Sequence, residues 1–268
     1  MNRRIVLILL LLPLVSQTPL AANECWNGTI VEVDGVTHVR NAATSKCPPK
    51  VYDLVPRWTL SSDDESGFIF GAIVDAVLHP SGVLCLLDNT LCCVHRIDTN
   101  GSLLGQLGRS GEGPGEFLFP TGIFVTEEGD LGVVDATKNA VQFVSLEGKP
   151  KGSWTLSVDG YDRTSLLRVN VHDGRYIVGC ELTSWEREGA RDHVFAGVFD
   201  TDGTLLAELG RKTVDRPDAA EMVFDEVASE PTIILGTHPN GSIYTTTAYE
   251  AYSYEIRNAA GNITHLVE

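Results

Sequence analysis

The stretch GRSGEGPGEFLFPTGI, residues 108–123, has the glycine content of a loop that could cradle phosphate groups. Such loops bind nucleotides through backbone N–H groups, and each class needs a set spacing. A P-loop requires GxxxxGK followed by Ser or Thr, and no lysine follows here. A dinucleotide-binding loop requires GxGxxG ahead of a helix, whereas these glycines follow GxGxG and precede the strand-like FLFPTGIFV. We therefore interpret the glycines as turn residues, with Pro114 stiffening the connection.

Histidine and cysteine are the other residue types whose positions could carry chemistry. His79, His172 and His238 occupy similar turns, and we expect those turns to lie too far apart to share one metal ion at bond lengths of about 2 Å. Cys92 and Cys93 are adjacent and lack the CxxC spacing of a zinc site. The sequence shows neither a Ser-His-Asp order nor an HExxH motif. We therefore predict no metal site and no catalytic residue.

Two pairs of cysteines differ in what their spacing predicts. Cys25 and Cys47 bracket NGTIVEVDGVTHVRNAATSK, which we expect to form a hairpin turning at its Asp-Gly pair. Because export permits disulfides, we predict that these two cysteines are bonded. Cys85 and Cys93 flank a short loop, so they could pair with each other or remain two reduced core residues.

The first 22 residues are typical of a secretory signal peptide. Arg3 and Arg4 precede the apolar run IVLILLLLPLV (5–15), and small residues follow at its end. The run is shorter than the roughly 20 apolar residues that a membrane-spanning helix needs. The formal net charge of −16 opposes binding to nucleic acid or anionic lipid. We expect a secreted or periplasmic protein that begins near Asn23, spans no membrane and binds no nucleic acid.

A repeat of 47 residues underlies the chain and indicates which elements position these residues. HPSGVLCLLD (79–88) aligns with TEEGDLGVVD (126–135), and the turns DTNG and SLEG follow at the same interval. DTDGTLLAELGR (200–211) repeats DTNGSLLGQLGR (98–109), and the turn signals VHDG and HPNG mark two looser copies. Each copy contains four short apolar or β-branched runs separated by Gly, Asn or Asp turns. Four-stranded units at intervals of about 40 to 50 residues are typical of a β-propeller.

We therefore predict an all-β fold, a propeller of four-stranded antiparallel blades. The expected blades lie near 69–108, 119–157, 164–210 and 231–268. Only 216–227 has a helical pattern, with Asp215 as the cap and Pro217 as the first helical residue. The predicted domains are a signal peptide (1–22), an N-terminal hairpin (23–48) and the propeller (49–268).

Several of these segments resemble NHL-repeat proteins. LGRSGEGPGEFLFPTGI and GDLGVVDATKNAVQFV (129–144) look most like exported bacterial six-bladed propellers of the TolB-like propeller superfamily. VEVDGVTHVRN (31–41) and VYDLVPRWTL (51–60) resemble the lead-in of those proteins, in which the latter strand completes the last blade. About four blades plus lead-in strands are visible here. We expect a truncated reading frame or a fragment, with a closed five-bladed ring as the alternative.

Strand order divides the predicted loops between two faces. Short, uniform turns such as HPSG and DTNG lie on the turn face. The opposite connection face carries the inter-blade connections and the varied loops 88–90, 135–139, 181–193 and 246–252. Binding residues concentrate on variable loops of a rigid scaffold, and arginine and aromatic residues favour binding hot spots. The candidate ligand-binding residues are Arg109, Glu112, Glu116, Trp185, Arg187, Arg191, His193, Arg211, Tyr249 and Tyr252. For Arg109 and Arg211, which follow their blades at matching places, we also expect hydrogen bonds to loop carbonyls.

The resemblance leaves two classes of function open. Some propellers are calcium-dependent lactonases or peptide-amidating lyases, and the lactonases gather Glu, Asn and Asp at the central tunnel. Asp88, Asp135 and Asn139 could supply part of such a calcium set, although Asp at that place also caps a turn in non-catalytic blades. We favour an exported, non-catalytic binding module without a cofactor, whose connection face takes a protein, peptide or glycan, because the fold alone implies little chemistry.

Overall fold

The computed structural model describes residues 26–49, 51–53, 55–60, 69–186, 189–217, 234–238, 240–246 and 253–268. Every regular element in these ranges is a β-strand, as predicted. No helix among the described residues is long and apolar enough to cross a membrane.

The strands form four sheets, and within each blade the strands follow chain order. Blade one consists of β3 (Ile73–Leu78), β4 (Leu84–Asp88), β5 (Cys93–Ile97) and β6 (Leu103–Leu107). Blade two consists of β7 (Pro120–Val125), β8 (Leu131–Asp135), β9 (Ala140–Val144) and β10 (Pro150–Thr155). Blade three consists of β11 (Arg163–His172), β12 (Arg175–Glu186), β13 (Gly189–Phe199) and β14 (Leu205–Pro217). Blade four consists of β15 (Ile234–Thr237), β16 (Ile243–Thr246), β17 (Tyr254–Arg257) and β18 (Ile263–Val267).

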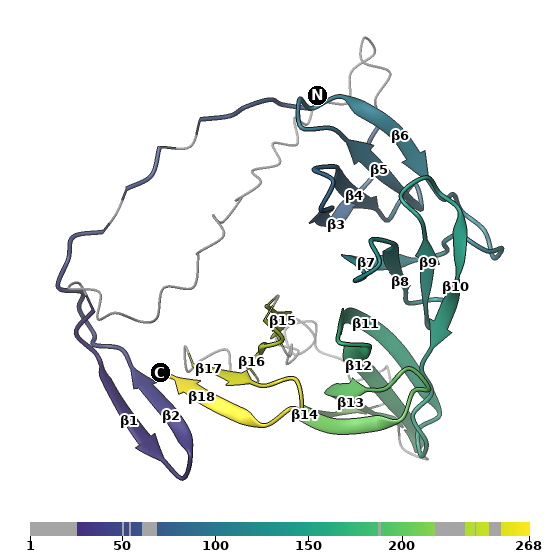
Figure 1. Ribbon diagram of the computed structural model, residues 1–268. Coiled ribbons are helices and arrows are strands. Elements are labelled where there is room, and N and C mark those ends of the chain that lie inside the picture. Colours follow the sequence, from purple (N-terminus) through teal and green to yellow (C-terminus); the bar gives the residue numbers. More distant parts are fainter. Residues whose placement is uncertain are drawn as a thin grey trace.

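The blades form an arc, and the N-terminal hairpin extends its last sheet (Figure 1). β1 (Thr29–Val33) and β2 (Val36–Arg40) turn at Asp34 and Gly35, both with positive φ, as the predicted hairpin requires. β2 pairs in parallel with β18, so blade four becomes part of a six-stranded sheet. No strand pairing within the described ranges joins this hairpin to blade one. The sheets therefore do not close into a ring.

The core lies between successive blades. All five residues of β4 and of β8 are buried, because each sheet is covered on both faces by its neighbours. The core between blades two and three includes Trp154, whose ring stacks on Tyr176 with centroids 4.1 Å apart. These packed faces hold the loops of the connection face on a rigid support.

The lead-in segment covers the outer face of blade one. Trp58 and Leu60 pack against the cluster of Leu84, Leu86 and Ile97. Trp58 Nε1 donates to Thr99 O of blade one at 3.3 Å. Trp154, on the outer strand of blade two, makes the equivalent bond to the next blade, because its Nε1 donates to Thr201 O of blade three at 3.1 Å. Residues 57–60 therefore occupy the place of a preceding blade's outer strand, as their resemblance to the family's lead-in implies.

One sequence-based prediction needs correction, and the structure bears on two others. Asp215 and Pro217 belong to β14 and do not begin a helix; the remainder of the predicted helix lies outside the described residues. Cys85 and Cys93 are both free and buried, which is the second of the two alternatives stated for them. Cys47 is disulfide-bonded, but its predicted partner Cys25 lies outside the described residues, so this pairing stays a prediction.

Candidate functional site

The glycine-rich connection, residues 108–119, is an ordered loop that joins blades one and two. Gly108 has φ 75°, and a Cβ placed there would meet the fully buried Phe117 ring at 2.2 Å. The N–H of Gly111 donates to Phe117 O at 3.0 Å, and the N–H of Gly113 donates to Glu116 Oε2 at 2.9 Å. Because these N–H groups are used within the loop, they do not face a phosphate. The glycines act as turn residues, as predicted.

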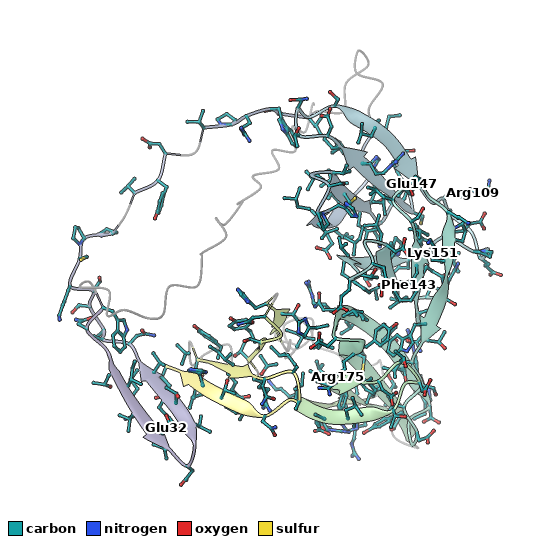
Figure 2. The ribbon with its side chains drawn as sticks, viewed as in Figure 1. Glu32, Arg109, Phe143, Glu147, Lys151 and Arg175 are labelled. Atoms are coloured by element: carbon teal, nitrogen blue, oxygen red, sulfur yellow. The ribbon has the colours of Figure 1, made fainter. Side chains whose placement is uncertain are left out.

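Two arginines bond carboxylates in place of the loop carbonyls that we expected. Arg109 Nε donates to Glu116 Oε1 at 2.7 Å, on the outer rim of the arc (Figure 2). The Gly113 N–H and then Arg109 lower the pKa of Glu116 below its usual value. Arg211 pairs with Glu208 at 3.0 Å. A guanidinium matches a carboxylate better than a single carbonyl, which explains the difference.

Asp88 and Asp135 are buried and hold equivalent places in their blades. Asp88 accepts the N–H groups of Gly71, Ala72 and Leu91 and contacts His95 Nε2 at 3.1 Å. Burial acts to raise the pKa of Asp88, but the Leu91 and Gly71 N–H groups and His95 together lower it. Asp135 accepts four backbone N–H groups, from the following residues: Leu118, Phe119, Thr137 and Lys138. Both carboxylates therefore fasten the second strand of a blade to the segment entering its first strand.

Asn139 fastens blade two to blade three. Its Nδ2 donates to Leu156 O at 2.8 Å, and its Oδ1 accepts the Leu166 N–H at 3.1 Å. Because both the nitrogen and the oxygen of its amide are hydrogen-bonded, the Asn139 side chain is held in one orientation at this junction.

A cluster in blade one has residue types of nucleophilic catalysis that the sequence analysis did not single out. Cys93 Sγ lies 3.7 Å from His95 Nε2, which also contacts Asp88. All three residues are buried. Burial, with the charge of Asp88, raises the pKa of Cys93 to about 12, so the sulfur is a protonated thiol. The cluster belongs to the core.

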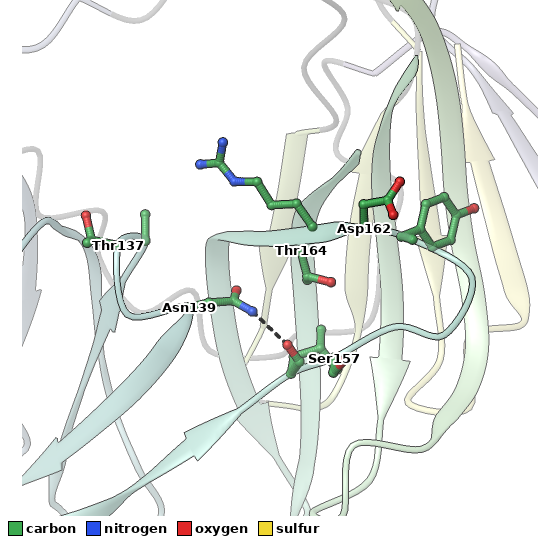
Figure 3. Close-up of a pocket in the computed structure, with 9 residues that line it drawn as sticks. Thr137, Asn139, Ser157, Asp162 and Thr164 are labelled. Carbon is green, nitrogen blue, oxygen red and sulfur yellow. Dashed lines mark hydrogen bonds between the residues drawn. The ribbon is translucent and has the colours of Figure 1, made fainter. Parts of the chain in front are cut away.

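A depression of about 500 Å³ opens between blades two and three, and we call it the junction pocket (Figure 3). Loop 136–139 forms one wall, and the connection from β10 to β11 forms the other. Its lining residues are Ala136, Thr137, Asn139, Leu156, Ser157, Tyr161, Asp162, Arg163 and Thr164. Its volume is within the range of small-molecule sites, about 300–1,000 Å³.

The paired strand ends of blade three lie beside this pocket. We call residues 183–186 and 189–192 the ladder rim; they were predicted as a loop, but β12 and β13 continue through them to the pair Glu186 and Gly189. The Asp162 N–H donates to Thr183 O at 2.9 Å, and the Trp185 N–H donates to Asp162 Oδ2 at 2.8 Å. Asp162 therefore joins the pocket wall to the ladder rim. Trp185 is 63% exposed there.

Other predicted residues support the wall behind Tyr161. Arg211 hydrogen-bonds the Tyr161 hydroxyl and lies 5.8 Å from its ring centroid. His193 packs edge-on against the same ring at 5.3 Å and hydrogen-bonds Thr213. These contacts fix the orientation of Tyr161. The structure thus brings Trp185, His193 and Arg211 to one junction.

Of the remaining predicted residues, the four that the structure describes do not line this junction pocket. Arg109, Glu112 and Glu116 belong to the glycine-rich connection, which Lys138 joins to loop 136–139 by donating to Glu116 O at 2.8 Å. Arg191 lies on β13, whereas the remaining three candidates, Arg187, Tyr249 and Tyr252, lie outside the described residues. The connection 157–164 was not among the predicted binding loops. It could have been found because its sequence differs from the glycine-rich connection that follows the previous blade.

Turns of neighbouring blades approach more closely than we predicted. His79 Nε2 lies 2.9 Å from Gly129 O, and the Asp173 N–H donates to Glu127 Oε1 at 2.7 Å. Ligand atoms of Glu127, His172 and Asp173 lie within 4.8 Å of one another, because adjacent blades place these turns side by side. These contacts join the turns of adjacent blades on the turn face.

The four-stranded blades and their packing define the chain as a β-propeller protein. Residues 74–188 match the family described as "6-bladed beta-propeller", which confirms the relationship to six-bladed propellers. An exported protein from Bacteroides fragilis is similar in structure, with 12% identity and a TM-score of 0.56 over 94% of this chain. This chain spans 58% of that protein.

Two further similarities are more remote. Virginiamycin B lyase from Staphylococcus aureus has 9% identity and a TM-score of 0.40, with 72% of this chain and 68% of the lyase covered. Ubiquitin carboxyl-terminal hydrolase A from Dictyostelium discoideum is 27% identical over 101 residues, which are 36% of this chain and 12% of that protein.

Proposed function

We propose that this protein is an exported, non-catalytic binding module that takes a protein, peptide or glycan at the junction pocket and the ladder rim. The observation that supports this most directly is the pairing of a polar depression of about 500 Å³ with a 63%-exposed tryptophan on a fixed strand end. Large rigid aromatic residues dominate the energetics of binding surfaces.

The walls of this site are preorganised. Asn139 is bonded at both ends, and Asp162 is bonded to the ladder rim through its N–H and its carboxylate. The packed core of blades two and three lies directly beneath. A site that is already ordered loses little conformational entropy when a ligand binds, so its contacts translate more fully into affinity.

The test is to screen the purified protein against oligosaccharide, peptide and extracellular-protein arrays, and to measure dissociation constants for each hit. Trp185→Ala should weaken a true ligand by at least about tenfold, as expected for a hot-spot aromatic residue. Tyr52→Ala, which removes a 75%-exposed aromatic residue from the lead-in, is the matched control and should leave affinity unchanged.

Two results would contradict this function. The first is a ligand whose affinity is unaffected by Trp185→Ala but falls when the turn face is altered, for example by Asp202→Ala. The second is turnover of a lactone or a peptide-lyase substrate that survives in the Trp185→Ala variant.

A further inference from the structure

The junction pocket contains hydrogen-bonding groups that the fold does not use. Within the described part of the chain, the side-chain hydroxyls of Thr137, Ser157 and Thr164 have no protein partner, and neither does the Arg163 guanidinium. Figure 3 shows the three hydroxyl-bearing side chains around the depression, with Asp162 at its edge. Each hydroxyl can both donate and accept a hydrogen bond. The pocket therefore matches a ligand that is itself rich in groups of that dual kind.

The junction between blades one and two is covered by a different connection. The glycine-rich connection contacts loop 135–139 from the side of blade one, where Lys138 Nζ donates to its carbonyl oxygens at Gly113 and Glu116. Cys92 occupies the position that corresponds to Asn139, and its thiol donates to Leu118 O. The connection 157–164 lacks the glycine-rich insert and leaves its own side of loop 136–139 open. The two connections therefore differ in how they meet this loop.

The charge of the pocket indicates a neutral ligand. Among its lining residues, Asp162 carries one negative charge and Arg163 one positive charge. The chain as a whole has a net charge of −16, which repels anionic ligands. One carboxylate beside one guanidinium can accept from and donate to neighbouring hydroxyl groups of one molecule.

The pocket also has apolar surface in fixed places. Tyr161 is among its lining residues and its ring is held by Arg211 and His193, while Leu156, another lining residue, is 1% exposed. A sugar ring has the matching composition, with hydroxyl groups around its edge and C–H groups on its faces. A peptide strand would instead need a row of free main-chain groups, whereas this pocket offers mainly side-chain hydroxyls.

We propose that the junction pocket is a subsite for a neutral oligosaccharide, with Thr137, Ser157, Asp162, Arg163 and Thr164 bonding its hydroxyl groups and Tyr161 packing against a ring face. This assignment rests on the proposed function and names its ligand class. Trp185 on the ladder rim extends the site for a further part of the same chain of sugars.

Titration calorimetry with neutral gluco-, xylo-, manno-, galacto- and arabino-oligosaccharides tests the assignment. At least one series should bind, and Thr164→Val should weaken it about two- to tenfold, the effect of losing one neutral hydrogen bond. Asp162→Asn should weaken it by more than about tenfold, because a charge-assisted bond is lost while the acceptor for the Trp185 N–H is kept. Thr155→Val alters an exposed threonine of β10 outside the pocket and should have no effect.

The outcomes separate the two proposals. If no neutral oligosaccharide binds, but a peptide or protein ligand is weakened by Trp185→Ala, the sugar assignment is wrong and the binding module stands. Binding of only polygalacturonate or another acidic glycan, lost on Arg163→Ala and at high salt, also overturns the neutral class. If every ligand that binds is insensitive to Asp162→Asn, Thr164→Val and Trp185→Ala, both proposals fail.

Discussion

Gly108→Ala tests whether the glycine-rich connection is a structural staple. The backbone φ of 75° costs a non-glycine residue about 1–2 kcal/mol. The new methyl group would also lie 2.2 Å from the Phe117 ring, and overpacking of a core typically costs about 1–3 kcal/mol. We therefore expect a loss of about 2–5 kcal/mol in the free energy of unfolding.

Gly174→Ala is the matched control for this change. Gly174 has φ 66°, but no atom lies within 4 Å of a Cβ added there, so only the backbone cost of about 1–2 kcal/mol applies. Urea unfolding followed by fluorescence, with the slope compared between variants, measures both losses. If Gly108→Ala costs no more than Gly174→Ala, close packing of Phe117 is not the reason for a glycine at this position.

Three further predictions follow from buried contacts. The pKa of Asp88 is lowered in the folded protein, so its contribution to stability is present above the unfolded pKa of about 3.9 and is lost as pH falls through the folded pKa. Asp88→Asn should therefore reduce the free energy of unfolding at pH 7 by about 1.5–3 kcal/mol and flatten the acid side of a profile of melting temperature against pH. An unchanged profile would contradict this. Trp154→Ala removes a stacked ring that is 7% exposed and should lower the free energy of unfolding by about 3–5 kcal/mol in chemical denaturation. Trp58 is only half-buried, so Trp58→Ala should cost less and should make residues 51–60 the first site of limited proteolysis. A larger loss for Trp58→Ala than for Trp154→Ala would contradict this. Non-reducing peptide mapping should recover Cys25 and Cys47 in one linked peptide, and a different partner for Cys47 would refute that pairing.

The propeller could be predicted from the sequence because its turns need left-handed residues at fixed places. Gly82 and Gly129 have φ 87° and 86°, and Gly101 and Gly148 have φ 85° and 89°. Few residues other than glycine adopt such angles easily, so the repeat is visible as a repeat of glycines. The boundaries of blades one and two followed from those landmarks, whereas blade three continues to Pro217, beyond its predicted end at 210.

The candidate site was only partly predictable, because its residues do not repeat. The sequence places Trp185, His193 and Arg211 on the connection face but predicts a loop over 181–193, where charged residues interrupt the apolar pattern. In the structure, cross-strand pairing continues through the described residues of this stretch, with Leu182, Thr183 and Asp192 buried and Trp185 exposed. Tyr161, Asp162 and Arg163 were missed, since no second copy of their connection drew attention to them.

Hydrogen–deuterium exchange, with and without the tightest ligand found in the arrays, tests the central claim most directly. We predict slower exchange in residues 136–139, 156–164, 183–186 and 189–192 when the ligand is present, because bound ligand would exclude water from the junction pocket and ladder rim. Turns 79–82, 126–129 and 171–174 should exchange at unchanged rates. Protection of those turns, with none at the pocket, would place binding on the opposite face and contradict the account.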